Sequence, residues 1–399
     1  METSQEINLL TGKKIAIVGG GPGGLTLAKL LQQKGVNVQV YERDKSQSSR
    51  VQGSIVDLHF DSGLKAINAA GLLEEFAANY MPGADKYRLL DIKGNILLDD
   101  GNQKGTADFG NEHFRPEIDR GKLRDILLAS LLPDTVIWNS QFVSMHEVKN
   151  GWELHFKNGN TAFADIVIGS DGYRSLVRPI LTDIKALYSG ATIIQGEINH
   201  PKDECPEIFQ WVDQANLMAM GAGSTIAVQL RGDGGLTFYA ASMHPENWGE
   251  TNGIDFKDAG AVRSYLNDHF KEWNEVFFTL FEACQHFVLR PLNYFPMEHQ
   301  WTTRAGLTLI GDAAHLMPPN GEGVNLAMLD ALDLSECLTN TAFNDLHTAT
   351  AAYENIMFER AAGLSRETVE GIADFASPTD ESIKEFIKMM SEGQSTIQH

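Results

Sequence analysis

The stretch IAIVGGGPGGLTLAKLLQQKGVNVQVYE at residues 15–42 constrains the fold more than any other part of the chain. A short apolar run at 15–18 predicts a buried strand, and the apolar spacing after it predicts an amphipathic helix. A second apolar run at 36–41 predicts another strand. The turn before the helix matches G-x-G-x-x-G, with its glycines at Gly19, Gly21 and Gly24. This order predicts the βαβ unit that binds adenine dinucleotides.

Each part of this unit has a physical role in binding a dinucleotide. The first glycine permits a tight turn, the second lets the backbone approach a pyrophosphate, and the third lets helix and strand pack closely. The N–H groups at the start of the helix then bind the pyrophosphate. Glu42, at the end of the second strand, can accept hydrogen bonds from both ribose hydroxyls. The alternative is an ordinary βαβ turn that binds no nucleotide.

A second element far downstream, LTLIGDAAHLMPPNGEGVN at 307–325, favours FAD over NAD as the dinucleotide. Its strand ends at Gly311-Asp312, and a long helix is predicted to begin near Gly323. The Asp312 carboxylate can accept a hydrogen bond from a ribityl hydroxyl. The first turn of the helix would face the flavin N1–C2=O edge with Gly323, Val324 and Asn325. Taken alone, these residues also fit a simple strand-to-helix turn.

A third element, ADIVIGSDGYRSLVR at 164–178, contains a strand that ends at Asp171-Gly172. Together with DRGKLR at 119–124, the three elements follow the order found in the class A flavoprotein monooxygenases, and residues 10–375 resemble that family of aromatic hydroxylases. The resemblance implies that Asp171 lies where FAD and the nicotinamide cofactor approach each other. It also implies that Asp312 holds the ribityl chain.

The resemblance implies a reaction in which the cofactor, and no side chain, carries the chemistry. NADPH or NADH reduces the flavin, O2 adds at flavin C4a, and the resulting hydroperoxide transfers oxygen to an electron-rich carbon. Pro318 and Pro319 are expected to line the reacting flavin edge.

The chain resembles the tetracycline-inactivating monooxygenases of that family most strongly, through LAKLLQQKGVNVQVYERD, AGLLEEF and IGDAAHLMPP. That resemblance assigns Arg50 to the nicotinamide cofactor and Gln195 to the substrate. It assigns to FAD the residues Glu42, Arg43, Asp57, Arg120 and Asp312. The substrate wall departs from the pattern: Asn216 replaces an arginine, and Ala227 and Thr237 replace an aromatic residue and a histidine. The reaction type therefore transfers better than the substrate.

We expect an α/β fold with a Rossmann-like FAD-binding domain, a β-sheet substrate domain and a long C-terminal helix, which is the aromatic hydroxylase fold. Residues 1–184 and 287–345 would form the FAD-binding domain, with short segments of the substrate domain inside it. Alternating apolar residues at 185–286 predict the β-rich substrate domain, with helices over 256–286 on its outer side. Residues 346–399 would form a helical segment.

Composition excludes several classes of protein. The net charge of −21 and the pI of about 4.9 disfavour nucleic acid and anionic membranes as partners. No apolar run approaches the roughly 18 residues of a membrane span. Three cysteines without metal spacing and twelve histidines without an HExxH motif predict reduced thiols and no metal site. We expect a cytoplasmic monomer whose partners are O2 and a small-molecule substrate.

Three functions fit these motifs. The first is an FAD-dependent monooxygenase that uses NAD(P)H and O2 to hydroxylate a polycyclic, phenolic or enolic molecule, with tetracycline-type antibiotics among the candidates. The second is a reductase or dehydrogenase on the same fold, and the third is a flavin-containing protein that sequesters an antibiotic. Two histidines also have alternatives. His315 is either a catalytic base or packs at the pyrophosphate loop, and His59 either links covalently to flavin or packs near Asp57.

Overall fold

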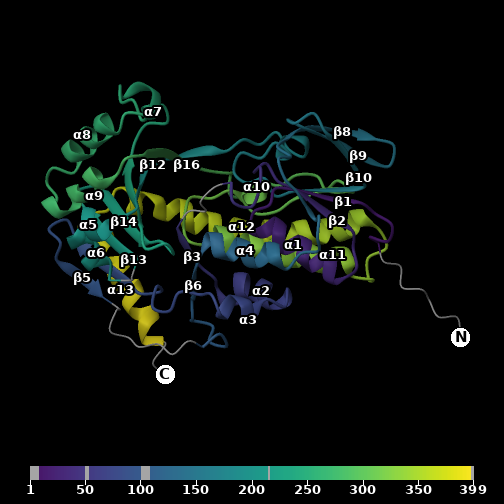
Figure 1. The fold of residues 1–399 in the computed structure, drawn as a ribbon, viewed down its shortest axis with the longest axis horizontal. Coiled ribbons are helices and arrows are strands. Elements are labelled where there is room, and N and C mark those ends of the chain that lie inside the picture. The colour runs from purple at the N-terminus through teal and green to yellow at the C-terminus, as the bar shows by residue number, and fades with distance from the viewer. Residues whose placement is uncertain (1–8, 50–53, 100–107, 214–215, 397–399) are drawn as a thin grey trace, which may run out of the picture.

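The computed structural model describes residues 9–49, 54–99, 108–213 and 216–396. Two sheets lie at opposite ends of an elongated molecule, and the long helix α12 (Leu346–Ala376) runs from one to the other (Figure 1). The short two-stranded sheet of β3 (Ile55–Asp57) and β6 (Glu117–Asp119) lies between the two ends. The fold is therefore mixed α/β with a long C-terminal helix, as the sequence predicted.

One end is built on a five-stranded parallel sheet in the order β17-β11-β1-β2-β7. Its strands in chain order are β1 (Ile15–Val18), β2 (Val38–Tyr41), β7 (Val136–Ile137), β11 (Ile166–Gly169) and β17 (Leu307–Leu309). β1, β11 and β17 are buried along their whole length, as expected for parallel strands covered on both faces. The prediction of β1 is confirmed, while β2 begins two residues later than expected.

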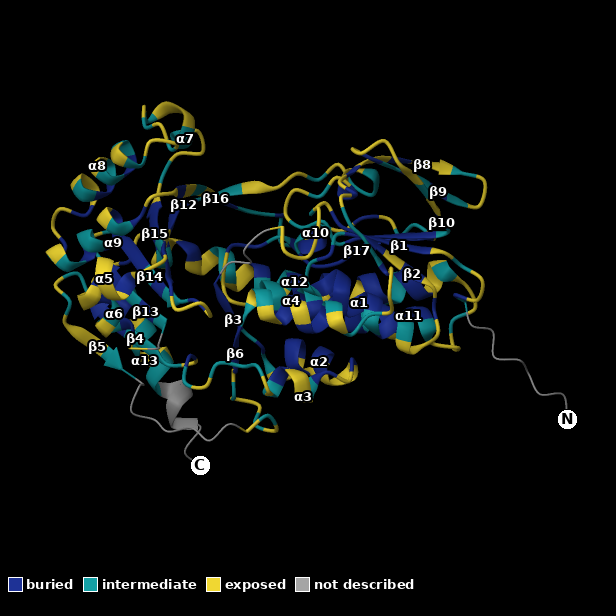
Figure 2. Cartoon of the chain, in the orientation of Figure 1, coloured by how far each residue is buried: buried dark blue, intermediate teal, exposed yellow. Residues whose placement is uncertain are grey.

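Helices cover one side of this sheet, and a β-meander covers the other. The helices are α1 (Pro22–Gln33), α4 (Arg120–Ala129) and α11 (Gly323–Thr339), with α2 (Lys65–Ala69) and α3 (Leu73–Ala77) beyond them (Figure 1). The antiparallel meander consists of β8 (Phe142–Val148), β9 (Gly151–Phe156) and β10 (Thr161–Ala164). It packs on the sheet through Phe156, whose ring stacks on Tyr41 with centroids 4.7 Å apart. Figure 2 shows that α1 and α11 are largely buried.

The other end is a seven-stranded sheet in the order β16-β12-β15-β14-β13-β4-β5. Its central strands are β12 (Leu187–Ile198), β13 (Asn216–Gly221), β14 (Ser224–Leu230) and β15 (Leu236–Met243). The edges come from outside 185–286, as β4 (Tyr87–Asp91), β5 (Ile96–Asp99) and β16 (Phe287–Tyr294). The β-rich character expected for 185–286 is therefore present, and the domain boundaries stay a prediction.

Short helices pack on the outer face of the seven-stranded sheet. They are α5 (Pro201–Glu204), α6 (Pro206–Val212), α8 (Ala259–His269), η3 (Glu275–Phe277) and α9 (Phe278–Ala283), with α7 (Trp248–Thr251) beyond them. Phe238 of β15 packs between them against Phe281, and both side chains are fully buried. The helical period at 256–286 predicted α8, η3 and α9 correctly, whereas α5, α6 and α7 lie outside that range. The inner face of the sheet is left for α12 and for the cavity described below.

The helix α12 ties the two ends together because it bonds to both. Near its start, Tyr353 donates a hydrogen bond to the Leu309 carbonyl at 2.8 Å, at the end of β17. Near its end, the Phe375 carbonyl accepts a hydrogen bond from Thr225 of β14. Asp345 caps the helix by accepting from the Thr348 N–H. After α12 comes α13 (Asp380–Thr396), so the described residues after 345 are mostly helical, as expected.

Candidate active site

The glycine turn between β1 and α1 is shaped by two close backbone contacts. Gly19 has a φ of +110°, and a Cβ there would lie 2.3 Å from the Ser170 carbonyl oxygen. A Cβ on Gly24 would lie 2.2 Å from the Gly19 carbonyl oxygen. A Cβ on Gly21 would meet nothing within 4 Å, so the N-terminus of α1 faces open space. The turn can therefore receive a pyrophosphate at that helix end.

Glu42 closes this turn from the end of β2. Its buried carboxylate accepts hydrogen bonds from the Gly20 N–H at 2.7 Å and the Asp44 N–H at 2.9 Å. The Arg124 guanidinium lies alongside, 3.3 Å from the Asp44 carboxylate, whereas Arg43 is exposed. Glu42 thus holds the glycine turn in addition to the ribose contact expected of it.

The Asp171 carboxylate is engaged by its own loop. It accepts hydrogen bonds from the Ser175 hydroxyl at 2.6 Å and from the Leu176 N–H at 2.7 Å. Burial raises the pKa of Asp171, and these hydrogen bonds oppose that rise. Asp171 therefore shapes the loop that follows Ser170, and the Ser170 carbonyl oxygen lies against Gly19.

Asp312 differs from Asp171, because its half-buried carboxylate receives no hydrogen bond from the described residues. It begins the short helix α10 (Asp312–His315), and burial raises its pKa although the charge of His315 opposes the rise. A Cβ on Gly323, the first residue of α11, would lie 3.7 Å from Asp312 Oδ1. An unpartnered acceptor beside a helix N-terminus fits a chain of hydroxyl groups, as in the ribityl part of FAD.

His59 joins the loop after β3 to the start of α11. Its Nε2 lies 2.7 Å from the Asp57 carboxylate and its Nδ1 lies 3.0 Å from the Glu322 carboxylate. Burial lowers the pKa of His59, but the two carboxylates outweigh it and raise the pKa to about 9. Both ring nitrogens are engaged, which favours packing over a covalent flavin link.

Asn325 makes a second connection at the same place. Its side-chain oxygen accepts hydrogen bonds from the His59 and Gly63 N–H groups, and its Nδ2 donates to the Asp57 carbonyl at 3.0 Å. Asn325 is fully buried. Asp57 and Asn325, both expected to bind cofactor, are therefore fixed to each other by the fold.

His315, the second histidine with two interpretations, belongs to a buried network of charged side chains. Its Nε2 lies 2.6 Å from the Asp330 carboxylate, which also pairs with Arg360 at 2.6 Å. Burial lowers the pKa of His315, but Asp330 reverses the effect and raises it. His315 points into the protein between α10, α11 and α12, so the structure supports the packing interpretation.

A cavity of about 440 Å³ lies between the two ends of the molecule. Five residues predicted from the sequence line it, namely Asp57, Arg120, Gln195, Ala227 and Pro319. No sequence motif indicated several other lining residues, among them Ser54, Glu117, Gln229, Tyr239, Arg290 and Phe375. Asn216 and Thr237 are not among the lining residues: Asn216 lies on the same face of the sheet as Ala227 but donates a hydrogen bond to Glu117, and Thr237 is fully buried in β15. Two residues expected to bind the cofactor, Asp57 and Arg120, therefore meet two expected to bind the substrate, Gln195 and Ala227, at one cavity.

Two pairs of polar residues form hydrogen bonds in the cavity wall. Arg290 Nε donates to Gln195 Oε1 at 2.5 Å, which leaves the Gln195 amide NH2 as a donor. The Tyr239 hydroxyl lies 2.9 Å from the Ser54 hydroxyl. Gln195, Tyr239 and Ala227 lie side by side in the register of β12, β15 and β14. This register places them on one face of the sheet.

Glu117 of β6 is a buried acid at the edge of this cavity. Its Oε1 accepts a hydrogen bond from Asn216 at 3.0 Å, while its Oε2 has no partner among the described residues. Burial and the neighbouring Asp57 raise the pKa of Glu117 to about 8, against the effect of the Asn216 hydrogen bond. Glu117 is therefore protonated at neutral pH.

We expect Glu117 to make the protein less stable as pH rises. The pKa of Glu117 in the folded protein, about 8, lies above its pKa in the unfolded protein. The contribution of Glu117 to stability is therefore complete below about pH 4.3 and is lost as the pH rises through 8. The Glu117→Gln variant lacks this titration. Between pH 5 and 6.5 the difference in unfolding free energy between the two proteins should change by about 1.4 kcal/mol per pH unit.

Urea unfolding at several pH values measures this difference. His59 does not interfere in that interval, because it is protonated in the unfolded state below about 6.5 and in the folded state up to about 9. Parallel stability curves for the wild type and Glu117→Gln would show that Glu117 is ionised in the folded protein.

The chain matches the family model described as an FAD binding domain over residues 13–195 and 292–352. It belongs to this family of FAD-binding proteins. Among curated relatives it is 28% identical to the monooxygenase asqM of Emericella nidulans, over 87% of this chain and 92% of the relative. No helix among the described residues is long and apolar enough to cross a membrane.

Solved structures show the same fold. HpxO of Klebsiella pneumoniae, complexed with FAD and uric acid, superimposes with a TM-score of 0.77 at 20% identity, over 99% of this chain and 97% of that one. The tetracycline destructase Tet(51) superimposes with a TM-score of 0.72 at 20% identity, over 96% and 97% of the two chains. The fold is thus that of the aromatic hydroxylases.

Proposed function

We propose that this flavin-dependent monooxygenase uses NAD(P)H and O2 to hydroxylate a planar, electron-rich molecule that carries phenol or enol groups. The observation that carries the proposal is the single cavity at which Asp57 and Arg120, expected at the flavin, meet Gln195 and Arg290. Tetracycline-type antibiotics, the substrates named for one structural neighbour, are among the candidates. For such a substrate the enzyme would confer antibiotic resistance.

The cavity wall supports this substrate class because it combines flat apolar surfaces with cationic donors. Ile193, Leu292 and Phe375 supply apolar surface. The guanidinium of Arg290 and the amide NH2 of Gln195 can donate to one edge of a substrate. Phenolate, enolate and carbonyl oxygens accept such hydrogen bonds, and those to a charged oxygen are the strongest.

FAD would be held by groups that the structure already positions. The glycine turn and Glu42 would bind the pyrophosphate and ribose, Asp312 the ribityl hydroxyls, and Gly323 to Asn325 the flavin N1–C2=O edge. When bound, FAD supplies the redox chemistry that activates O2. Arg290 then favours the ionised phenol or enol, which raises the electron density of the ring carbon that is hydroxylated. Pro319 and Phe375 limit the access of water.

An open cleft next to the glycine turn supports the proposal that the enzyme uses NAD(P)H. This cleft, of about 870 Å³, is lined by Lys122 and Arg124 of α4 and by Ser46. Lys122 is exposed and can meet a phosphate. Arg50, assigned to the nicotinamide cofactor by resemblance, lies outside the described residues. We further propose a cytoplasmic monomer, in keeping with three buried free cysteines.

One experiment separates the proposed function from its alternatives. The purified protein is given NADPH or NADH in air, with tetracycline, a simple phenol or no substrate, and products are analysed by mass spectrometry. We expect substrate-stimulated consumption and a product heavier by one oxygen atom. Loss of double bonds without added oxygen would indicate a reductase, and binding without turnover would indicate a sequestering protein.

We predict that Arg290→Gln raises KM for a phenolic substrate by roughly 10- to 150-fold, because a charge-assisted hydrogen bond contributes about 1.5–3 kcal/mol. FAD content should stay unchanged, since Arg290 lies on the substrate sheet. Steady-state kinetics measure the effect. Arg366→Gln is the matched control, because Arg366 is exposed and, among the described residues, forms an ion pair only with the surface residue Glu298. An unchanged KM in Arg290→Gln would remove Arg290 from substrate binding.

A further inference from the structure

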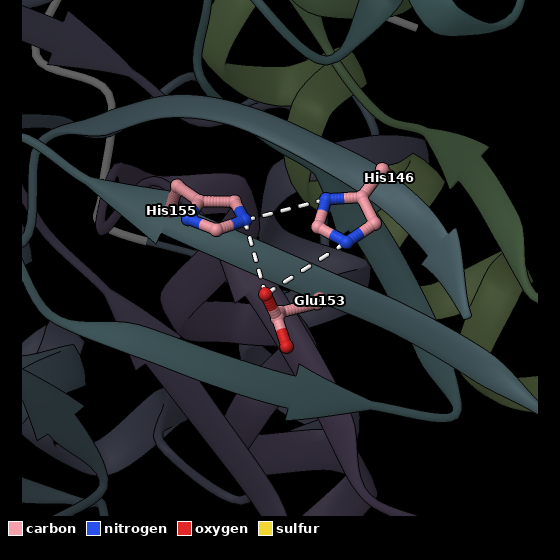
Figure 3. Close-up of side chains that lie close together, drawn as sticks. All are labelled: His146, Glu153 and His155. Carbon is pink, nitrogen blue, oxygen red and sulfur yellow. Dashed lines mark hydrogen bonds and ion pairs between the residues drawn. The ribbon is translucent and has the colours of Figure 1, made fainter. Parts of the chain in front are cut away.

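Three side chains with metal-binding donors meet on the β-meander, away from the cavity. β8 and β9 form a hairpin whose register places His146 opposite Glu153. His155 follows Glu153 by two residues, so both lie on the same face of β9. The three side chains therefore converge on one face of the hairpin (Figure 3).

The distances between the donor atoms suit a small metal ion. His155 Nε2 lies 3.3 Å from His146 Nδ1 and 3.2 Å from Glu153 Oε1. Zinc binds nitrogen and oxygen donors at about 2.0–2.2 Å, so two ligands on one tetrahedral ion lie about 3.3–3.5 Å apart. His146 presents Nδ1 to His155 but Nε2 to Glu153, at 3.8 Å, so its ring would turn to bring one nitrogen to the ion.

The chemistry of the donors selects the class of ion. Two imidazoles and one carboxylate suit Zn²⁺, Ni²⁺ and Cu²⁺, whereas Mg²⁺ and Ca²⁺ prefer oxygen donors alone. The neighbouring acid Glu147 pairs with Arg304 at 2.6 Å and, by strand alternation, lies on the other face of β8. The three side chains are 57%, 42% and 37% exposed for His146, Glu153 and His155, so ions and water can reach them.

We propose that His146, Glu153 and His155 form a binding site for a divalent transition-metal ion of the zinc class, with at least one coordination position left to water. The bound ion would join β8 to β9 and stabilise the meander that packs on the parallel sheet. This site is separate from the cavity and does not depend on the proposed reaction. A search for HExxH misses it because the ligands are brought together by strand register.

Isothermal titration of the untagged, FAD-loaded protein with ZnCl2 tests the site. We expect one equivalent of Zn²⁺ to bind, and His155→Ala and Glu153→Gln each to weaken binding by at least about tenfold, which is 1.4 kcal/mol. The matched control is His113→Ala, since His113 also lies beside a glutamate, Glu112 at 3.5 Å, and belongs to no such cluster among the described residues. That variant should bind Zn²⁺ like the wild type.

Two results would overturn the proposal. One is the absence of saturable binding, and the other is wild-type affinity in both His155→Ala and Glu153→Gln. Circular dichroism of each variant shows whether the hairpin substitutions leave the fold intact. Because titration measures binding of the metal alone, a negative result here leaves the monooxygenase proposal standing.

Discussion

Replacing Asp330 with asparagine is expected to lower the free energy of unfolding by about 3–5 kcal/mol, the cost of breaking a buried ion pair. Asp330 is fully buried, and its two oxygens serve different partners. Oδ2 accepts from His315 at 2.6 Å and from the Gly311 N–H at 2.7 Å, while Oδ1 pairs with Arg360 at 2.6 Å. An asparagine has one acceptor oxygen, so its NH2 group would face a donor on one side.

Urea unfolding followed by circular dichroism measures this loss. Asp333→Asn is the matched control, because Asp333 lies on the same helix and binds the same Arg360 at 2.6 Å, but its side chain is 14% exposed. Arg360 keeps its buried partner in that variant, so the loss should be smaller. Equal losses in the two variants would show that the His315 and Gly311 contacts add nothing to the Arg360 pair.

Elements set by short-range signals were predictable from the sequence. Gly19 and its neighbours mark the glycine turn in the sequence, and the apolar period indicates the strand and helix on either side. The same holds for the start of α11 at Gly323, which the preceding prolines and glycines indicate. These elements carry most of the expected FAD contacts, so that half of the site was accessible to sequence reasoning.

The substrate half depends on contacts between distant strands, which a local pattern does not contain. Gln195 and Arg290 are 95 residues apart and meet because β12 pairs with β16. Asn216, expected on the substrate wall, donates a hydrogen bond to Glu117, 99 residues away in the sequence, which no local pattern indicates. The metal-binding cluster was missed for the same reason, since His146 meets Glu153 only through the hairpin register.

Replacing Glu42 tests the FAD-binding half of the site most directly, because its carboxylate binds backbone N–H groups of the protein and is also expected to bind the ribose of FAD. Glu42→Ala removes the acceptor of the Gly20 and Asp44 N–H groups as well as the ribose contact. We expect FAD binding to weaken by about 1.5–3 kcal/mol, which raises Kd roughly 10- to 150-fold. Flavin fluorescence during titration of the apoprotein gives the Kd.

The Glu42→Gln variant distinguishes the two roles of this side chain. Glutamine keeps one acceptor oxygen, which can still bind the Gly20 N–H, but it lacks the charge that strengthens hydrogen bonds from ribose hydroxyls. Its Kd for FAD should therefore lie between those of the wild type and Glu42→Ala. If both variants bound FAD as tightly as the wild type while unfolding more easily, Glu42 would hold the glycine turn alone. The ribose would then be bound by another acceptor.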